Sequence, residues 1–334
     1  MISLAGESRE VRNFFRAMCV VFIAILWSCS HRRDSIAFHE LGLNGSQSGV
    51  WRKLLTKATS NPEYFKKFYL PGPFTVTAHR GLLLTATAGD SLKVDFFKSH
   101  HDSPAPLVVI VHGNGYSRLA HASQAERIAS WGFHCLTVDV PNRHEWRENG
   151  SRIRRLTQLL YSFPQVLATK LDRKKIYLIG HSFGGSAATL AAQNNRKVAG
   201  LVLLDPAVVH PVVGKAMKRI KSPVILLGAD KKRFRSRKRS LFFKNVSAPM
   251  AEISIIGATH EDAQYPSINK VHWGFDVKTD EEKQKVFLAN IVTSLFSMAR
   301  TDDPLKSLGY AWSVFKGQLK SGLIKKARVR SAKN

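Results

Sequence analysis

The sequence predicts an α/β fold in which a mostly parallel sheet carries helices on both faces. From residue 107 onward, short apolar runs rich in β-branched residues alternate with longer segments of helical pattern. Strands that are joined through helices form parallel sheets, and these sheets are buried on both faces. Strands are expected at 74–79, 92–98, 107–112, 134–139, 175–180, 199–204, 223–228 and 251–256. Helices are expected at 118–131, 151–171, 183–194 and 281–299.

Length and composition agree with one large globular enzyme domain. The chain has 334 residues, of which 44% are hydrophobic, so it can bury a substantial core. The sequence contains no Walker motif, dinucleotide-binding fingerprint or cluster of metal ligands. We therefore expect neither a metal ion nor an organic cofactor.

A Gly-x-Ser-x-Gly turn gives the strongest chemical signal. The apolar run 175–179 leads into Gly180-His181-Ser182-Phe183-Gly184, and the small-residue helix 186–192 follows. A strand-to-helix turn this tight needs glycines on both sides of the serine, and its strain exposes the hydroxyl. Ser182 is therefore predicted to be a nucleophile, with the N–H of Phe183 pointing to where an oxyanion would form.

A nucleophilic serine needs a base and a carboxylate that orients this base. Asp230 directly follows the run 223–229, and the run 251–256 leads through Gly257-Ala258-Thr259 to His260. Both residues follow the carboxyl ends of strands, where open parallel sheets place their functional groups. The sequence therefore predicts a Ser182, Asp230 and His260 triad.

A glycine-rich turn upstream completes the predicted site. The apolar run 107–111 ends at His112-Gly113-Asn114-Gly115. The glycines let the main chain approach a substrate, so the N–H of Asn114 is expected to be the second oxyanion donor, with Gly115 as the next candidate.

These three motifs resemble those of the α/β-hydrolase superfamily over residues 72–300, and most of all those of uncapped dienelactone hydrolases, chlorophyllases and cutinase-like polyester hydrolases. The resemblance implies an α/β-hydrolase fold that starts with antiparallel strands. Many relatives insert a cap between the strands that correspond to 199–204 and 223–228, but here the connection has room for only a short helix. No large cap is therefore expected, and the cleft should be open to bulky, lipid-like or polymeric substrates.

Other residues compete for these roles. Asp205 also ends an apolar run, and some relatives place their acid there, although the position of Asp230 is the commoner one. His210 and His272 lie downstream of the serine, but neither directly follows a strand. Cys135 lies within an apolar run and is expected to be a core residue.

The N-terminus resembles an export signal. Arg9, Arg12 and Arg16 precede the apolar stretch 17–27, which is too short to span a bilayer as a stable helix. The following Ser28-Cys29 resembles a bacterial lipoprotein cleavage site, so Cys29 is predicted to carry a lipid. We expect residues 1–28 to be removed and 29–71 to form a lipidated N-terminus and linker. In a double-membrane bacterium, the sorting would favour the outer membrane.

The formal net charge of +27 predicts attraction to anionic surfaces such as acidic lipid headgroups. Much of the charge lies in the run 231–239, next to Asp230, and in the tail 301–334. The run 231–239 is either a solvated surface or a rim that binds an anionic substrate or membrane. The tail is expected to begin a helix at Asp303-Pro304 that packs on the core, lies on a membrane or ends in disorder from about Lys325 onward. No nucleic-acid-binding module is recognisable, so nucleic acid is not an expected partner.

The sequence thus predicts a serine hydrolase of carboxylic esters in the cell envelope. Thioester hydrolysis and acyl transfer would use the same groups and remain alternatives. A non-catalytic, basic envelope-binding protein on the same fold is a further alternative.

Overall fold

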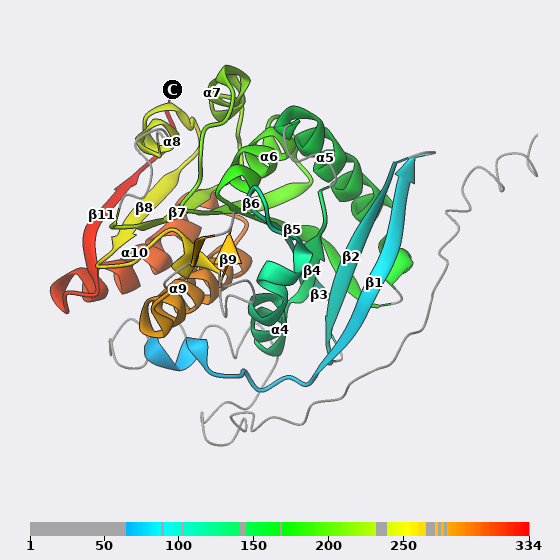
Figure 1. Ribbon diagram of the computed structural model, residues 1–334, viewed down its shortest axis with the longest axis horizontal. Helices are drawn as coiled ribbons and strands as arrows, with labels where there is room; N and C mark the ends of the chain where they lie inside the picture. The colour runs from blue at the N-terminus through cyan, green and yellow to red at the C-terminus, as the bar shows by residue number, and fades with distance from the viewer. Residues whose placement is uncertain are drawn as a thin grey trace, which may run out of the picture.

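A nine-stranded sheet forms the centre of the computed structural model (Figure 1). The structure describes residues 65–87, 90–101, 103–140, 145–167, 169–231, 239–264, 271–272, 275–276 and 279–333. The sheet strands are β1 (Val76–Thr87), β2 (Asp90–Ser99), β3 (Ala105–Val111), β4 (His134–Val138), β5 (Leu171–His181), β6 (Val198–Leu204), β7 (Val224–Ala229), β8 (Met250–Ile255) and β11 (Ile324–Arg330). Their order in space is β1-β2-β4-β3-β5-β6-β7-β8-β11.

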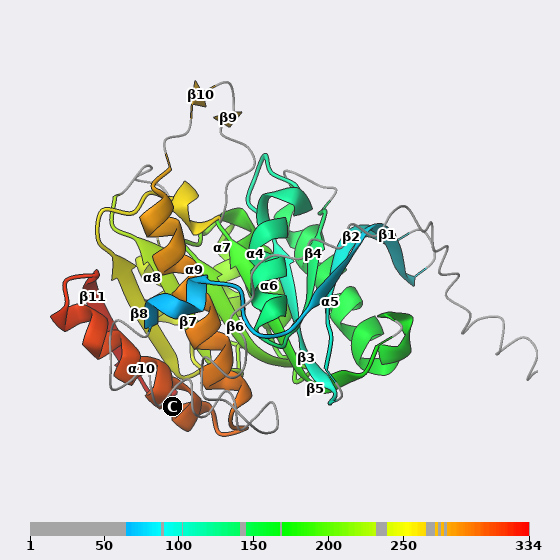
Figure 2. The ribbon, with the colours of Figure 1, turned by 90° about the horizontal axis from the view of Figure 1, so that it is seen from below.

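Six strands that are consecutive in this order, β4, β3, β5, β6, β7 and β8, are parallel to one another. The β1–β2, β2–β4 and β8–β11 pairs are antiparallel. All eight predicted sheet strands are present, and the antiparallel start implied by the family resemblance is confirmed. The two-residue strands β9 (Val271–His272) and β10 (Phe275–Asp276) form a separate hairpin that projects from the body of the molecule (Figure 2).

Helices cover both faces of the sheet (Figure 1). The helices are α4 (Ala122–Ser130), α5 (Trp146–Ser162), α6 (Phe183–Ala192), α7 (Pro211–Met217), α8 (Ser240–Asn245), α9 (Glu281–Ala299) and α10 (Pro304–Lys320). The 3-10 turns are η1 (Lys66–Tyr69), η2 (Arg118–His121), η3 (Pro164–Leu167) and η5 (Glu261–Ala263). Residues of α4, α9 and α10 share one apolar cluster with one face of the sheet, and residues of α5, α6, α7 and α8 share a second cluster with the other face.

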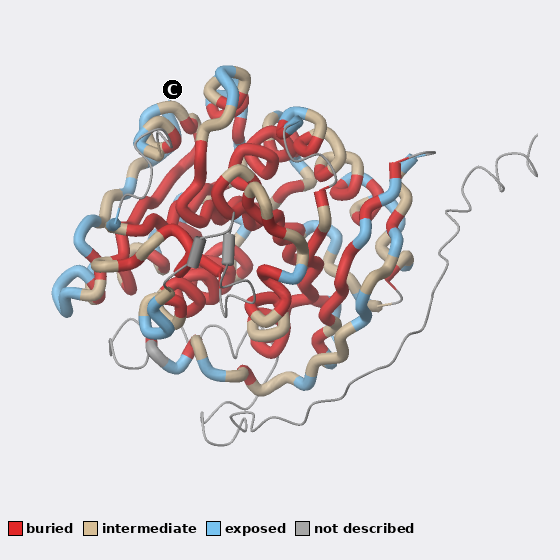
Figure 3. The backbone as a smooth tube through the Cα atoms, in the orientation of Figure 1, coloured by how far each residue is buried: buried red, intermediate tan, exposed pale blue. Residues whose placement is uncertain are grey.

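The alternation of side chains along β5 shows why the sheet needs both layers. Tyr177 and Ile179 belong to the cluster with α9, whereas Ile176 and Leu178 belong to the cluster with α6. Successive residues of a strand point to opposite faces, so a strand made only of apolar residues must be covered twice. Figure 3 shows the resulting buried centre.

Three of the four predicted helices differ in extent from the structure. The segment expected to be one helix at 118–131 is divided into η2 and α4, and the helix expected at 183–194 is α6, which ends at Ala192. The helix expected at 151–171 is α5, which begins at Trp146 and ends at Ser162. Proline disfavours helical geometry in the preceding residue, so Pro164 prevents α5 from continuing through Phe163. The predicted bounds 281–299 are those of α9.

The C-terminal tail is part of the same fold. Asp303 caps α10 by accepting from the N–H of Leu305 at 2.9 Å, as the Asp303-Pro304 pair predicts. The side chains of Asn290 in α9 and Gln318 in α10 exchange two hydrogen bonds, at 3.0 and 2.8 Å. The following strand, β11, completes the sheet, so the expected boundary at residue 300 does not separate the tail from the domain, and residues beyond Lys325 pack against β8.

The N-terminal boundary also lies earlier than the expected residue 72. Phe68 in η1 packs edge-on against Trp131 and Phe296, with ring centroids 5.4 and 5.6 Å away. Burying these rings joins η1 to α9 and the turn after α4. Residues 1–64, which include the predicted signal and Cys29, lie outside the described residues.

Between β6 and β7 the chain forms only α7, so no cap domain is inserted there. Within the ranges given above, no helix has the length and apolar character needed to cross a membrane.

Candidate functional site

Ser182 sits on a strained turn between β5 and α6. Its backbone angles are φ 54° and ψ −120°, a conformation that residues with a side chain adopt rarely. The main chain of Ser182 is held by hydrogen bonds to Leu204 and from Gly185 and Ala207, between 2.9 and 3.0 Å long. This pairing fixes the strained turn to the end of β6, as expected for a nucleophile elbow.

The glycines of the turn are required by close main-chain packing. A Cβ on Gly180 would lie 2.6 Å from the carbonyl oxygen of Gly184. A Cβ on Gly184 would lie 2.4 Å from the carbonyl oxygens of Val111 and His112. Real Cβ atoms do not approach so closely, so only glycine lets α6 start this near to β3 and β5.

His260 is hydrogen-bonded to Asp205. Its Nδ1–H donates to Oδ2 of the carboxylate at 2.6 Å, and both residues are buried. Asp205 directly follows β6, and His260 lies in the connection after β8, so both come from carboxyl ends of parallel strands. The predicted position of His260 at this edge of the sheet is confirmed.

The prediction that Asp230 orients His260 is wrong. The carboxylate of Asp230 lies 3.3 Å from Nζ of Lys325 in β11, and its backbone N–H bonds to the carbonyl of Ile255. Asp205 follows β6, the direct neighbour of β5, which leads into Ser182, whereas Asp230 follows β7, one strand farther away. The carboxylate that contacts His260 is therefore Asp205, at the less common of the two positions that the sequence offered, and Asp230 instead contacts the edge strand β11.

Asp205 is compensated by a cation that sequence reasoning placed elsewhere. A guanidinium nitrogen of Arg239 donates to Oδ1 of Asp205 at 2.6 Å and to the carbonyl of Ala229 at 2.7 Å. The N–H of Ala229 also donates to Oδ1, at 3.2 Å. Burial alone would raise the pKa of Asp205, but the hydrogen bond and charge of His260, followed by those of Arg239, hold it well below its ordinary value.

The ionic contacts continue from Arg239 to the edge of the sheet. Its Nε lies 3.9 Å from Glu252 in β8, and Glu252 in turn accepts from Nε of Arg328 in β11 at 2.6 Å. The guanidinium of Arg239 packs against Gly228 where it contacts Asp205. A Cβ at position 228 would lie 2.2 Å from the guanidinium, so glycine leaves the room that the arginine needs. Charges of alternating sign thus connect His260 to the C-terminal strand.

Arg239 is the last residue of the basic run 231–239, which the sequence predicts to be either a solvated surface or a binding rim. It points into the fold and contacts Asp205, so it is not part of an exposed rim. Residues 232–238 lie outside the described residues. Lys231, at the start of the run, is exposed.

Two further contacts fix the loop that carries His260. The buried carboxylate of Asp262 accepts from the N–H and the hydroxyl of Thr259 at 2.7 and 2.9 Å, and from the N–H of Asp280 at 2.7 Å. Nε2–H of His181 donates to the carbonyl of His260 at 3.1 Å. His181 is thus a hydrogen-bonding residue of the turn that carries Ser182. Asp262 was not identified from the sequence.

A second buried histidine supports this loop. The ring of His121 packs against His181, with centroids 5.6 Å apart, and its Nδ1 is 2.8 Å from Oε1 of Gln124. Nε2 of Gln124 donates to the carbonyl of Ala263 at 3.2 Å. Burial lowers the pKa of His121 to about 4, so it is neutral at physiological pH.

The predicted oxyanion donors lie beside Ser182. A Cβ on Gly113 would be 2.9 Å from Cβ of Ser182, which places the turn before Asn114 against the serine. Phe183 is the first residue of α6, so its N–H has no partner within the helix. Neither the Asn114 N–H nor the Phe183 N–H bonds to a main-chain acceptor within the described part of the chain.

The competing residues have other roles. His210 caps α7 by accepting from the N–H of Val212 at 3.1 Å. His112 holds its own loop, since Nδ1 is 2.7 Å from the carbonyl of Gly113 and Nε2 accepts from the N–H of Val140 at 3.3 Å. Cys135 is a buried free thiol, and burial raises its pKa well above its ordinary value. The side chain of His272 lies outside the described residues.

No group of three or more histidine, cysteine or acidic side chains within the described ranges is arranged to hold a metal ion.

Comparison with known proteins agrees with this geometry. A family model described as the alpha/beta hydrolase family matches residues 108–287, which is more than half of the chain. The chain is also 25% identical, over 138 residues, to Lipase 1 of Moraxella sp. (strain TA144). This match covers 40% of the chain and 41% of the length of that relative.

Proposed function

Because the chain belongs to the alpha/beta hydrolase family, we propose that it is a serine hydrolase that cleaves carboxylic esters with Ser182, His260 and Asp205. The observation that carries this proposal is the 2.6 Å hydrogen bond from His260 to Asp205, beside a serine held at a positive φ. A serine, a base and an orienting carboxylate are the groups that acyl transfer through a serine requires.

In the proposed reaction, Oγ of Ser182 attacks the acyl carbon while Nε2 of His260 accepts the hydroxyl proton. Asp205 keeps Nδ1–H of His260 in place and stabilises the imidazolium that forms. The N–H groups of Phe183 and Asn114 donate to the oxyanion. The imidazolium then protonates the departing alcohol, and a water activated by His260 hydrolyses the acyl-enzyme.

Apolar side chains next to the site support an ester with a hydrophobic acyl group. Phe183 follows the serine and packs edge-on against Trp146, with ring centroids 5.5 Å apart. Val208 and Val209 follow Asp205 and, like Phe183, are only partly buried. These side chains offer apolar contact to a substrate at Ser182. The similarity to a protein named a lipase supports the same substrate class.

Arg239 is a positioning residue in this proposal. It binds Oδ1 of Asp205, while His260 binds Oδ2, so it fixes the carboxylate and keeps it ionised.

The proposal includes export and acylation at Cys29. It is supported by Arg9, Arg12 and Arg16, by the apolar stretch 17–27, and by the resemblance of Ser28-Cys29 to a lipoprotein cleavage site. An acylated Cys29 would hold the enzyme at a membrane surface.

Replacing Ser182 with alanine should lower the turnover of esters by about a million-fold, because the nucleophile acts as a unit with its base. Labelling by a fluorophosphonate probe should also disappear. Ser151→Ala, on the exposed side of α5, serves as the matched control and should retain both properties. Undiminished labelling of the Ser182 variant would refute the assignment.

Asp205→Asn should lower kcat by about ten thousand-fold, because an amide cannot hold His260 in the reactive tautomer. Asp230→Asn should change kcat by less than about tenfold, since Asp230 contacts Lys325 rather than His260. Steady-state kinetics on a short-chain ester measure both effects, with circular dichroism as the test of folding. A larger loss for Asp230→Asn would return the acid to the end of β7.

Arg239→Gln should lower kcat by about tenfold with little change in KM, because Asp205 loses its cationic donor at Oδ1 and holds His260 less firmly. Steady-state kinetics on a short-chain ester measure both constants, with the melting temperature as the test of folding. Arg239→Lys should restore most of kcat, and Lys231→Gln, at an exposed position of the same basic run, should leave it unchanged. An unchanged kcat for Arg239→Gln, or a loss that only follows the melting temperature, would contradict the positioning role.

Cys29→Ser should abolish metabolic labelling by a fatty-acid analogue and shift the protein out of the membrane fraction at high salt. High salt is needed because each Lys or Arg near an anionic membrane contributes about 1 kcal/mol to binding. Persistent labelling of the variant would exclude Cys29 as the acylated residue.

A further inference from the structure

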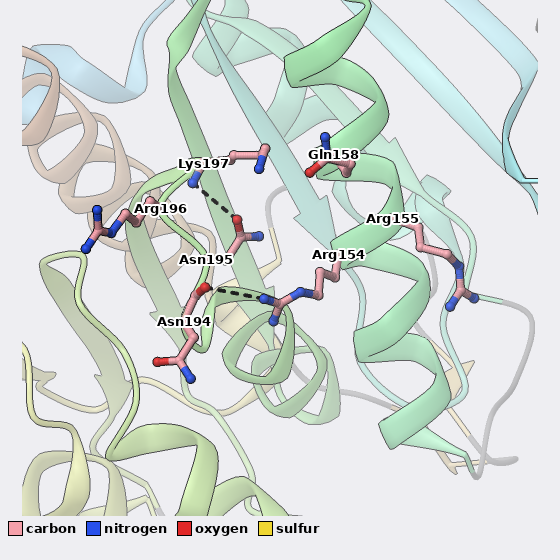
Figure 4. A pocket seen from close by; sticks show the side chains of 7 residues that line it. All are labelled: Arg154, Arg155, Gln158, Asn194, Asn195, Arg196 and Lys197. Carbon is pink, nitrogen blue, oxygen red and sulfur yellow. Dashed lines mark hydrogen bonds between the residues drawn. The ribbon is translucent and has the colours of Figure 1, made fainter. Parts of the chain in front are cut away.

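A basic pocket lies at the opposite end of the sheet from Ser182. It has a volume of about 450 Å³ and lies between α5 and the turn that joins α6 to β6 (Figure 4). This turn precedes the start of β6, whereas Ser182 and Asp205 follow the carboxyl ends of β5 and β6. The pocket is lined by Arg154, Arg155, Gln158, Asn194, Asn195, Arg196 and Lys197. It is therefore separate from the proposed catalytic site.

One of the four cations in the pocket is neutralised. Arg155 donates to Asp90 at 2.5 Å and to Glu148 at 3.0 Å. Arg154 is different, because its guanidinium donates to the carbonyls of Gln193 at 2.7 Å and Asn194 at 3.3 Å. These neutral acceptors hold the guanidinium against the turn (Figure 4) and leave its positive charge uncompensated.

Arg196 and Lys197 add two further uncompensated charges. Across the part of the chain that the structure describes, no carboxylate lies within ion-pair distance of either side chain or of Arg154. Nζ of Lys197 lies 5.3 Å from the ring centre of Tyr161, which orients the amine without neutralising it. The turn itself is ordered by a 3.2 Å hydrogen bond from the N–H of Lys197 to Oδ1 of Asn195.

We propose that this basic pocket binds the phosphate group of a phosphomonoester. Arg154 and Lys197 lie between α5 and the turn, and Arg196 adds a third positive charge on the outer side of the turn (Figure 4). Like charges gathered in this way repel one another, and a doubly charged oxyanion relieves this repulsion. Guanidinium groups donate parallel hydrogen bonds that match phosphate oxygens. Ligand pockets usually measure about 300–1,000 Å³, so the pocket has room for the phosphate and part of the molecule that carries it.

The phosphomonoester can come from a soluble metabolite or from a lipid headgroup such as phosphatidic acid. Both present the same oxyanion to the cations of the pocket. Because the pocket and Ser182 lie at opposite ends of the sheet, a ligand in the pocket does not occupy the proposed ester site. The inference is therefore independent of the proposed function.

The decisive variant replaces Arg154, Arg196 and Lys197 with glutamine. Its matched control replaces three exposed lysines of α10 and β11, Lys316, Lys320 and Lys326, with glutamine. The control therefore removes the same net charge at a distant place. Titration of the full chain with inorganic phosphate, followed by calorimetry, should show saturable binding for the wild type and the control. The pocket variant should bind at least tenfold more weakly.

The triple variant also removes Arg154, which holds the turn through its carbonyl contacts. A double variant, Arg196→Gln with Lys197→Gln, keeps Arg154 and so separates a loss of binding from a loss of folding. It should retain the wild-type melting temperature and lose at least threefold in phosphate affinity. Equal weakening in the pocket and control variants would reduce the effect to net charge and overturn the proposal. Absence of saturable phosphate binding to the wild type would do the same.

Vesicles distinguish the two sources of phosphate. If the group comes from a lipid, phosphatidic-acid vesicles should cosediment with the wild type and the control, and inorganic phosphate should compete. The pocket variant should then sediment less. If the ligand is soluble, the wild type, the control and the pocket variant should sediment to the same extent, while calorimetry still shows weaker phosphate binding by the pocket variant. This outcome supports a phosphate site for a soluble ligand.

Discussion

The hydrogen bond between His260 and Asp205 is the interaction on which the organisation of the site depends. Both residues are almost completely buried, and a buried carboxylate is stable only when its charge is compensated. His260 binds one oxygen, and Arg239 together with the N–H of Ala229 binds the other. The acid is therefore held at both oxygens, which fixes the imidazole that it contacts.

The same requirement connects the site to the C-terminus of the chain. Arg239, which is partly buried beside Asp205, also donates to the hydroxyl of Ser254 at 3.3 Å and lies within ion-pair distance of Glu252 in β8. Glu252 is 2% exposed and is itself compensated by Arg328 in β11. Breaking a buried ion pair by removing one partner leaves an uncompensated charge, which costs several kcal/mol. The edge strand β11 is therefore connected to Asp205 through side chains of alternating charge.

The two ends of the sheet differ in how their charges are compensated. At the carboxyl end of β6, the buried acid Asp205 is paired with Arg239. At the amino end of β6, Arg154, Arg196 and Lys197 line an open pocket and face no carboxylate of the described residues. Part of the net charge of +27 is thus gathered at one place, away from the proposed catalytic groups.

The sequence by itself determined the parts of this protein that depend on neighbouring residues. Strand periodicity located the eight strands from β1 to β8. Helix α9 has the bounds that the sequence predicts, and Asp280 is its N-cap residue. Ser182 was evident because the tight turn requires glycines on both sides of it. His260 was evident because it follows a strand end.

Only the tertiary structure decided which acid reaches His260. Asp205 and Asp230 both end buried strands, so local pattern cannot separate them, and the choice depends on the spatial order of β5, β6 and β7. Arg239 contacts Asp205 across 34 positions of sequence, and Lys325 holds Asp230 from a strand whose pairing with β8 the sequence did not reveal. Contacts between residues far apart in sequence follow from how the strands pair, which no local pattern encodes.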